Sequence, residues 1–374
     1  MRDVPSTDAR SEQFDPAQLV RSDIIAMDPY VPIVPFEVLS KRLGHDPQDI
    51  VKLDANENPF GPSPRALDAL RQPHYWHIYP DPEAGALRDA LADYTGVDHD
   101  HLLAGAGADE LIDLVLRAVL EPGQAVFNCP PSFGMYPFST AVNMGRLVDV
   151  PRRDDFSLDL AAVEAAVRAE PQARVLFVCS PNNPDGSVIS SEALKRLLNL
   201  PLLVVLDEAY VEFSGDSRIH WVQEHDNLVV LRTFSKWAGL AGLRVGYGAF
   251  PRWLLPHLWK IKQPYNVNVP AAQAAIASLQ DGELLLQRVQ TIVEERRQLE
   301  RELAGLDFLE PYPSRSNFVL CRVVGRDAAQ LKQALEKEGV LVRYFAKPGL
   351  DNCIRISAGR PQDSDRLLQA LRSL

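Results

Sequence analysis

The sequence predicts an α/β protein with a large, doubly wound, mainly parallel sheet domain, a smaller α+β domain and an N-terminal arm. Two patterns support this prediction. Runs such as RVLFVCS and LLVVLDEA are rich in Val and Leu without polar alternation, which is typical of strands buried on both faces of a parallel sheet. Helical patterns separate these runs in the order βαβαβ, which favours a sheet that binds ligands beyond the carboxyl ends of its strands.

The N-terminal part is expected to be an arm. A polar tail of about twenty residues comes first, with no apolar segment that would indicate a signal peptide and too many acids for a transit peptide. The segment that follows, IIAMDPYVPIVPFEVLSKRLG, contains Pro29, Pro32 and Pro35, which disfavour one continuous helix and favour an extended chain. A cytoplasmic location is the expectation that follows.

The large domain is expected from about Leu53 onward. Its strands are predicted in the runs QAVFNC, RLVDVP, RVLFVCS, LLVVLDEA and NLVVLRTFS, with helices between them. After a long helical stretch the pattern changes to NFVLCRV, DAAQLKQALEKEG, VLVRYF and CIRISAG, which indicates a small α+β domain. We therefore expect an arm with part of the small domain in residues 1–52, the cofactor-binding domain in 53–280 and the small domain in 281–374.

Composition excludes several classes of function. A length of 374 residues with 46% hydrophobic and 24% charged residues is ordinary for a globular enzyme with more than one core. The net charge of −11 gives no general footprint for nucleic acid or anionic membrane, and no apolar stretch of about 18 residues indicates a membrane span. The four cysteines lie far apart, so they form no CxxC pair.

Four segments at the predicted carboxyl ends of strands contain the candidate chemistry: GAGADE, SPNNPDG, LDEAY and TFSKWAGLAGLRVGY. The last contains Lys236 directly after a buried strand, with Arg244 eight positions later. Partial desolvation lowers the pKa of a lysine, and a free amine is what a Schiff base requires. Lys236 is therefore the leading catalytic candidate.

Longer motifs in a fixed order indicate a family. They are DPYVPIVPFEVLSKRLG, LDANENPFGPSP, IYPDPEAGALRDALADYTG, GAGADELIDLVLRA, CPPSFGMY, VCSPNNPDG, LDEAYVEF, LRTFSKWAGLAGLRVGY and CIRISAGRP. In this order they resemble the fold-type-I pyridoxal-phosphate enzymes and, within them, the histidinol-phosphate aminotransferase family, from about Tyr30 to near the end of the chain. The resemblance implies amino transfer between histidinol phosphate and 2-oxoglutarate or glutamate in histidine biosynthesis.

The resemblance implies roles for residues around the cofactor ring. Lys236 matches the Schiff-base lysine, and Asp207 matches the carboxylate that keeps the pyridine nitrogen protonated, so that the ring can withdraw electrons. Tyr210 and Asn183 match the groups that hydrogen-bond the phenolic oxygen. Phe133 matches the aromatic side chain that stacks on the ring, although the family often has Tyr there.

The resemblance also places the cofactor phosphate at the start of the helix opened by Ala108 and Asp109. Unpaired backbone N–H groups and the helix dipole favour an anion there. Thr233, Ser235 and Arg244 match the side chains that hold this phosphate, and the guanidinium fork of an arginine suits two phosphate oxygens.

Four further residues are implied to bind substrate or to serve a second subunit. Arg355 matches the arginine that binds the acidic end of the substrate, and Arg343 matches a second substrate arginine. Tyr79 matches a tyrosine that reaches the cofactor phosphate of the neighbouring subunit, and Tyr30 matches a residue that the arm contributes to the partner's substrate pocket. A homodimer with shared active sites is expected.

Alternatives stay open. An aromatic amino acid aminotransferase or a threonine-phosphate decarboxylase-like lyase would keep the cofactor residues; a regulatory domain is disfavoured because no basic helix-turn-helix segment precedes the enzyme-like region. Taken without the lysine, Asp207 and Glu208 are consistent with a metal-binding pair but more typical of a helix cap, and SPNNPDG is typical of a turn. Asp185 stands where the family usually has Thr, which leaves the local hydrogen bonding open. His74 and His77 lack the carboxylate partners that a metal site needs.

Overall fold

The computed structural model describes residues 16–29, 34–72 and 75–374. The chain divides into two compact units, Met1–Val31 and Pro32–Leu374. The described part of the first unit contains the short helices η1 Pro16–Leu19 and α1 Ser22–Ile25. Tyr30 and His74 lie outside the described residues.

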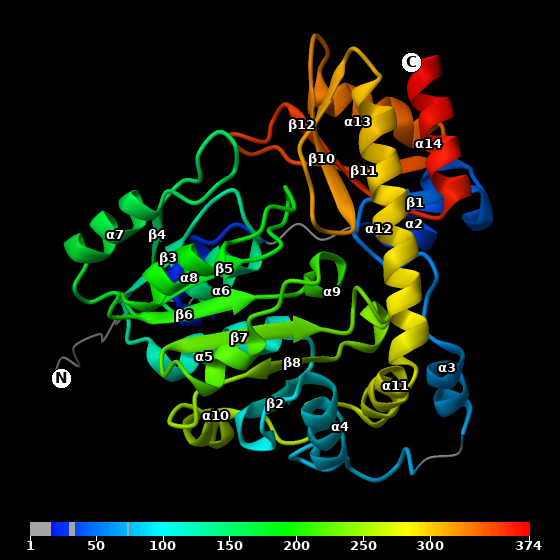
Figure 1. Ribbon diagram of the computed structural model, residues 1–374. Coiled ribbons are helices and arrows are strands. Elements are labelled where there is room, and N and C mark those ends of the chain that lie inside the picture. Colours follow the sequence, from blue (N-terminus) through cyan, green and yellow to red (C-terminus); the bar gives the residue numbers. More distant parts are fainter. Residues whose placement is uncertain (1–15, 30–33, 73–74) are drawn as a thin grey trace, which may run out of the picture. The chain divides into compact units, whose positions relative to one another are not determined.

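The second unit contains the predicted large sheet, with strand order β2-β8-β7-β6-β5-β3-β4 (Figure 1). Strand β8 runs antiparallel to both of its neighbours, and the pairs from β7 to β4 are parallel. The mainly parallel sheet predicted from the sequence is therefore confirmed. The strands are β2 Leu102–Gly105, β3 Ala125–Asn128, β4 Arg146–Asp149, β5 Val175–Cys179, β6 Leu203–Asp207, β7 Leu228–Thr233 and β8 Gly246–Ala249.

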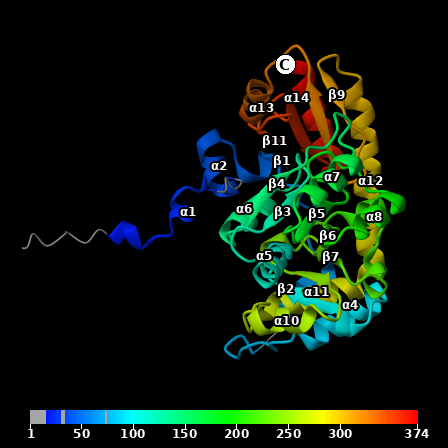
Figure 2. The same ribbon diagram turned by 90° about the vertical axis from the view of Figure 1, so that its left-hand side faces the viewer.

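Helices cover both faces of this sheet, because alternate side chains of a strand point to opposite faces and both sets are apolar. Leu176 and Val178 of β5 belong to one core cluster, and Val175 and Phe177 belong to another. The first core includes residues of α3 Pro64–Arg71, α4 Gly85–Thr95, α7 Leu160–Ala169, α8 Ser191–Leu198, α9 Val211–Ser214 and α11 Val269–Gln280. The second includes residues of α5 Ala108–Val119, α6 Met135–Val142 and α10 Leu255–Ile261. Figure 2 shows α5 and α6 on one side of the sheet and α8 on the other.

One strand differs from the prediction. The run RLVDVP was expected to be buried on both faces, but β4 is one of the two edge strands, and Arg146 and Asp149 at its ends are exposed. An edge strand has a neighbour on one side only, and charged residues there discourage pairing with other chains. The local apolar pair Leu147 and Val148 could not distinguish an edge strand from a central one.

The smaller sheet has the order β1-β11-β12-β10-β9, with β1 parallel to β11 and the other pairs antiparallel. Its strands are β1 Val51–Leu53, β9 Leu309–Pro311, β10 Phe318–Val323, β11 Val340–Tyr344 and β12 Cys353–Ser357. Helices α13 Ala328–Lys337 and α14 Pro361–Ser373 contribute to its core. Helix α2 Phe36–Leu43 begins directly after Pro35, so the extended conformation expected for the arm does not continue through this part.

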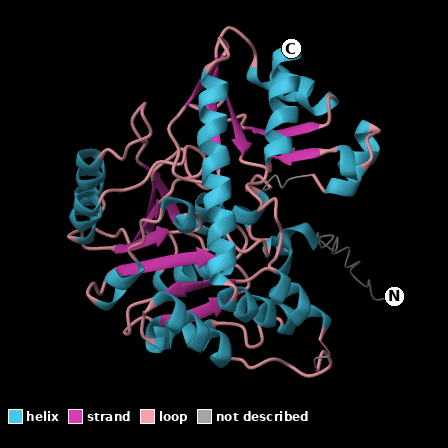
Figure 3. Ribbon diagram, turned by 45° about the vertical axis from the view of Figure 1, so that its right-hand side comes forward, coloured by secondary structure: helices cyan, strands magenta, loops and turns pink. Residues whose placement is uncertain are grey.

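The long helix α12 Gly282–Ala304 runs past both sheets (Figure 3). Leu285, Val289 and Ile292 belong to the core of the large sheet, whereas Leu299 and Leu303 belong to the core of the small sheet. Because one helix contributes to both cores, the domain boundary near residue 280 stays a prediction.

Short helical turns connect the larger elements. They are η2 Pro47–Asp49, η3 His99–His101, η4 Ile219–Gln223 and η5 Ala241–Leu243. No helix in the described part of the chain is both long enough and apolar enough to cross a lipid bilayer.

Candidate active site

The carboxyl edge of the large sheet brings the predicted residues together. Asp207 is the last residue of β6, and its Cα pairs with that of Cys179, the last residue of β5. Lys236 follows β7, which ends at Thr233, and Asn183 follows β5. Parallel strands end at the same edge of a sheet, so their following loops meet there.

The Lys236 amine lies in a largely enclosed position. Its Nζ donates to the backbone oxygen of Ala55 at 3.2 Å and lies 5.8 Å from the centre of the Tyr210 ring. Although the side chain keeps some exposed surface, desolvation and, next, the nearby Arg355 guanidinium lower the pKa of Lys236 to about 8. At neutral pH a usable fraction of this amine is therefore uncharged.

The Asp207 carboxylate is buried, with 3% of its surface exposed. Its Oδ2 accepts a hydrogen bond of 2.6 Å from the Tyr136 hydroxyl, and its Oδ1 accepts one of 3.0 Å from the Ala209 backbone N–H. Desolvation raises the pKa of Asp207 to about 6, while the Tyr136 hydrogen bond acts in the opposite direction. Tyr136 therefore favours the ionised form of this carboxylate.

Tyr136 was missed by the sequence analysis. It is fully buried on α6 and stacks on Phe177 with ring centres 4.6 Å apart. Its ring also meets Phe133 edge to face at 5.6 Å, so it contacts the predicted stacking residue as well as Asp207. The available signal was its place three residues after Phe133 in CPPSFGMY, where the turn that leads into α6 lets the Tyr136 backbone N–H donate to the Phe133 backbone oxygen at 3.3 Å.

Asn183 and Tyr210 are both arranged to donate hydrogen bonds. Arg355 Nη1 donates to Asn183 Oδ1 at 2.6 Å. Because a guanidinium can only donate, the Asn183 side-chain oxygen is the acceptor, and its amide N–H groups remain available as donors. The Tyr210 hydroxyl accepts from Asn56 Nδ2 at 3.0 Å, which leaves its own proton available. Two such donors, which follow the neighbouring strands β5 and β6, fit the phenolic oxygen of pyridoxal phosphate.

The start of α5 forms a cradle for an anion. No side chain caps this helix, and Gly107 precedes it with φ 86° and ψ 170°. A Cβ at Gly107 would lie 2.6 Å from an Arg244 nitrogen, so the arginine occupies the space that a side chain there would fill. Arg244 NH1 also donates to the Ser235 hydroxyl at 3.4 Å, and the Thr233 hydroxyl donates to that of Ser235 at 2.9 Å.

The cradle fits a phosphate, with one carboxylate beside it. Asp109 Oδ2 accepts from Arg244 NH2 at 3.1 Å, and Ala108 is the first residue of the helix. Backbone N–H groups, a hydroxyl pair and a guanidinium together make a donor set suited to a phosphate dianion. The residues present therefore fit all four polar features of pyridoxal phosphate: aldehyde, ring nitrogen, phenolic oxygen and phosphate.

Arg343 and Arg355 lie opposite each other on neighbouring strands, since their Cα atoms pair in the β11–β12 register. Directly paired residues of antiparallel strands point to the same face. Both guanidinium groups approach the Phe345 ring, at 5.7 Å and 5.5 Å from its centre. Arg355 is buried, and its NH2 donates to the backbone oxygen of Asp54 at 2.8 Å. The two predicted substrate arginines are thus brought together.

The departure at Asp185 has a local structural account. Its carboxylate is buried, receives a hydrogen bond from the Asn182 amide and accepts from the Ser187 backbone N–H at 2.8 Å. The carboxylate thus closes the turn in which a shorter Thr is usual, and Asn183 remains beside Arg355.

Tyr79 lies apart from the lysine site. It is 78% exposed and stacks on Tyr265 with ring centres 4.5 Å apart. Its expected contact with the phosphate of a second subunit lies beyond a single chain and stays a prediction.

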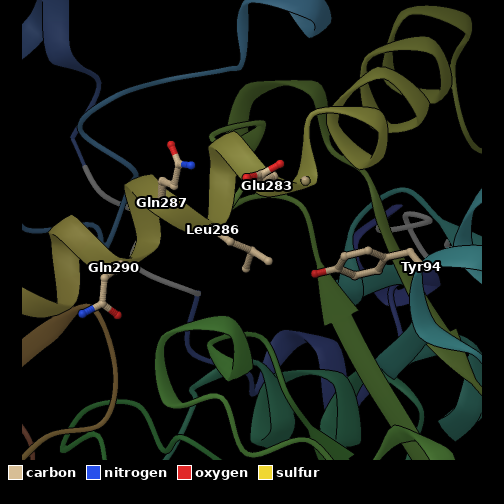
Figure 4. A pocket seen from close by; sticks show the side chains of 6 residues that line it. Tyr94, Glu283, Leu286, Gln287 and Gln290 are labelled. Atoms are coloured by element: carbon tan, nitrogen blue, oxygen red, sulfur yellow. The ribbon is translucent and has the colours of Figure 1, made fainter.

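A separate hollow lies beside the start of α12 (Figure 4). It is lined by Tyr94, Gly282, Glu283, Leu286, Gln287 and Gln290. This lining contains an acid and no Lys or Arg, so it is unsuited to a phosphate. In the described part of the chain no group of three or more His, Cys, Asp or Glu side chains is arranged to hold a metal ion.

Known proteins share this sequence and this architecture. A family model described as aminotransferase class I and II matches residues 48–371. A histidinol-phosphate aminotransferase of Nicotiana plumbaginifolia, described as chloroplastic, is 51% identical over 355 residues, covering 94% of this chain and 86% of that protein. The histidinol-phosphate aminotransferase of Roseiflexus castenholzii is 50% identical over 364 residues, covering 95% of this chain and 98% of that protein.

A solved structure is similar over nearly the whole chain. It is the crystal structure of histidinol-phosphate aminotransferase from Sinorhizobium meliloti in complex with pyridoxal-5'-phosphate. The two share 32% sequence identity and superpose with a TM-score of 0.84, covering 98% of this chain and 100% of the other.

Proposed function

We propose, because the chain belongs to the class I and II aminotransferases and within them to the histidinol-phosphate aminotransferase family, that it transfers an amino group between histidinol phosphate and 2-oxoglutarate with pyridoxal phosphate as cofactor. The observation that supports this most directly is the Lys236 amine, held within 5.8 Å of the Tyr210 ring at the sheet edge that ends in the buried Asp207.

Bound pyridoxal phosphate supplies an aldehyde carbon that takes up an amino group and a protonated ring that withdraws electrons from the substrate α-carbon. The phosphate would be held by the N-terminus of α5 with Ser235 and Arg244. Asn183 and Tyr210 would donate to the phenolic oxygen, and Asp207 would face the ring nitrogen.

Lys236 has two tasks in this proposal. It would hold the cofactor before substrate arrives, and afterwards its free amine would remove the proton from the substrate α-carbon. A pKa of about 8 suits such a base, because it is close to the working pH. The Ala55 carbonyl, 3.2 Å from Nζ, orients the amine by accepting one of its N–H groups.

Asp207 stabilises a proton on the ring nitrogen by its charge. Its burial strengthens that interaction, because charges attract more strongly where water is excluded. Tyr136 keeps the carboxylate ionised and holds one of its oxygens in place, so we propose it as a positioning residue of the cofactor site.

Arg355 and Arg343 would bind the acidic ends of the two substrates. The distal phosphate of histidinol phosphate and the carboxylate groups of glutamate are anions that a pair of guanidinium groups can bind in turn. The shared Phe345 ring supports this, because it contacts both guanidinium groups.

A half-reaction screen tests the function. The cofactor-loaded protein is mixed with one amine at a time (histidinol phosphate, glutamate, phenylalanine or threonine phosphate), and formation of pyridoxamine phosphate is followed by chromatography. We expect rapid formation with histidinol phosphate and glutamate, and none with the Lys236→Ala variant. Preference for phenylalanine would favour an aromatic aminotransferase, whereas release of carbon dioxide from threonine phosphate would favour a decarboxylase.

We also propose that the enzyme is a homodimer with shared active sites. The aromatic residues Tyr75, Trp76 and Tyr79 are all more than half exposed in the single chain, and Tyr265, which stacks on Tyr79, is 42% exposed. Tyrosine and tryptophan are enriched at protein interfaces, so a partner subunit would account for the exposure of these residues.

A further inference from the structure

The segment of residues 54–58, Asp-Ala-Asn-Glu-Asn, reaches several parts of the proposed site from outside the large sheet. The backbone oxygen of Asp54 accepts from Arg355, and that of Ala55 accepts from Lys236. Asn56 contacts Tyr210, and Asn58 Nδ2 donates to the backbone oxygen of Trp237 at 2.8 Å. Asn56 is the member of this segment whose side chain contacts a group assigned to the cofactor.

Both the backbone and the side chain of Asn56 are hydrogen-bonded to neighbouring residues. Its backbone N–H donates to the Ser357 hydroxyl oxygen at 2.9 Å, and that hydroxyl donates to Asn56 Oδ1 at 3.0 Å. Asn56 Nδ2 donates to the Tyr210 hydroxyl at 3.0 Å, and Asn317 Nδ2 donates to the Asn56 backbone oxygen at 3.0 Å. Only 1% of the Asn56 surface is exposed, so water cannot replace these partners.

The donors and acceptors of these hydrogen bonds form one consistent chain from Ser357 to Tyr210. A backbone N–H can only donate, so the Ser357 oxygen is an acceptor toward it and the Ser357 proton is free to point at the Asn56 carboxamide. The Ser357 hydroxyl donates to Asn56 Oδ1, so the carboxamide oxygen faces Ser357 and the NH₂ group is turned toward Tyr210. The Tyr210 oxygen then accepts, and its own proton must point elsewhere.

We propose that Asn56 is a positioning residue that aims the Tyr210 hydroxyl proton at the phenolic oxygen of the cofactor, with Ser357 of β12 fixing the orientation of its carboxamide. This role rests on the proposed function. Ser357 lies two residues after Arg355 on β12. The strand that carries the proposed substrate arginine therefore also orients the Asn56 carboxamide and, through it, the Tyr210 hydroxyl.

The backbone conformation at Asn56 restricts which side chains this position accepts. Asn56 has φ 54°, in the left-handed region that non-glycine residues seldom adopt and that Asn and Asp tolerate best. Asp is therefore the substitution that keeps both the backbone conformation and the shape of the side chain. It also reverses the hydrogen bond, because a carboxylate accepts where the amide donated.

The experiment measures the pH at which the visible absorption of the bound cofactor changes, in wild type and in Asn56→Asp. In the variant the Tyr210 proton turns toward the new carboxylate, and the phenolic oxygen loses a donor. A less stabilised oxygen anion holds the nearby proton more tightly, so the midpoint should rise by about one pH unit, as expected for one lost hydrogen bond to a charged group. The affinity for pyridoxal phosphate, measured by fluorescence titration, should fall in parallel.

A double-variant cycle separates donor direction from a general effect of charge. In a Tyr210→Phe background the hydroxyl is absent, so adding Asn56→Asp should move the midpoint no further. An undiminished shift in that background would overturn the inference, because the new charge alone would then be its cause.

Ser357→Ala tests the origin of the orientation, with Ser278→Ala as the matched control. Both serines are buried, but Ser278 donates to the Ala274 backbone oxygen within α11, away from the site. We expect Ser357→Ala to raise the midpoint and Ser278→Ala to leave it unchanged, whatever each does to thermal stability. If the wild type binds the cofactor and all variants have the same midpoint as the wild type, the role of Asn56 is contradicted. If the wild type binds no cofactor, the proposed function is contradicted instead.

Discussion

Burial destabilises the charged form of the Asp207 carboxylate in the cofactor-free protein. Two hydrogen bonds, from Tyr136 and Ala209, only partly offset its desolvation, and the pKa is raised from 3.8 to about 6. A bound pyridinium would supply the missing positive charge. The site is therefore arranged for the loaded enzyme rather than for the empty fold, as is common where strain or buried charge serves function.

We predict that Asp207→Asn stabilises the cofactor-free protein above pH 6 while weakening cofactor binding. Below about pH 3 the carboxyl is protonated in both the folded and the unfolded chain, so it does not lower the stability of the wild type. As pH rises to about 6 the unfolded chain ionises first, and the wild type loses on the order of 3 kcal/mol from this group. The amide does not titrate, so the variant should not show this loss.

Urea unfolding of both cofactor-free proteins, at about pH 4.5 and about pH 7.5, measures this difference. The stability gained by the variant relative to wild type should be larger, by about 2 kcal/mol, at the higher pH. A variant that is less stable than wild type at both values would show that the charge of Asp207 is compensated within the protein itself.

We predict that Arg355→Ala impairs both glutamate and histidinol phosphate, because one cationic site must bind both anions in turn. Loss of the charged fork should lower kcat/KM by about 2 to 5 kcal/mol in free-energy terms. Steady-state kinetics with each substrate measures this, and Arg355→Lys keeps the charge without the fork as the matched control. If only one substrate suffers, two separate anion sites exist.

At the scale of secondary-structure elements, the start of α5 shows why glycine is required before the phosphate cradle. Gly107 has φ 86° and ψ 170°, a region open almost only to glycine, and a Cβ there would meet Arg244 at 2.6 Å. Gly123 has a similar φ of 83°, but a Cβ at that position would have nothing within 4 Å. A substitution at Gly123 therefore introduces backbone strain alone, whereas one at Gly107 also displaces Arg244.

We predict that Gly107→Ala and Gly123→Ala both lower stability, on the order of 1 kcal/mol or more each, because both residues adopt positive φ. Only Gly107→Ala should weaken binding of pyridoxal phosphate, by displacing Arg244. Thermal unfolding and cofactor titration of the two variants provide the comparison. Equal cofactor affinities of the two variants would show that Arg244 and the start of α5 do not bind the cofactor phosphate.

The sequence predicted those site residues that follow strands, because each strand end is marked locally by a change from apolar to polar residues. Lys236, Asp207 and Asn183 were found in this way and by resemblance. The Ala55 carbonyl and the Asn56 carboxamide were not assigned roles, although their motif was recognised. Their contacts join residues more than 150 positions apart, and no local pattern records which elements will meet across two sheets.

At the scale of the whole molecule, the proposed site draws on both sheets. The large sheet supplies Lys236 and Asp207, while β12 of the small sheet supplies Arg355 and Ser357. Helix α12 packs into the cores of both. In the proposed dimer, the exposed Tyr79 would contribute to the site of the second subunit.

We predict that inactive variants complement each other in mixed dimers. If Tyr79 serves the partner's site, exchanging subunits between Tyr79→Ala and Lys236→Ala proteins creates dimers in which one site has both lesions and the other has none. Random pairing makes about half of the dimers mixed, so about a quarter of all sites should be intact.

Activity after exchange under mild denaturation measures the complementation, with each variant treated alone as its control. Recovery well above the sum of the two parents would support shared sites. No recovery, with exchange verified by mass spectrometry of differently tagged subunits, would place Tyr79 outside the neighbour's site.

The most direct test of the central claim is to identify the lysine that holds the cofactor. The protein is loaded with pyridoxal phosphate, reduced with borohydride to make the attachment permanent, digested and analysed by mass spectrometry. The account predicts one modified peptide, with the added mass on Lys236, and no modification at that peptide in the Lys236→Ala variant. Attachment at another lysine, with Lys236 unmodified in active wild-type protein, would contradict it.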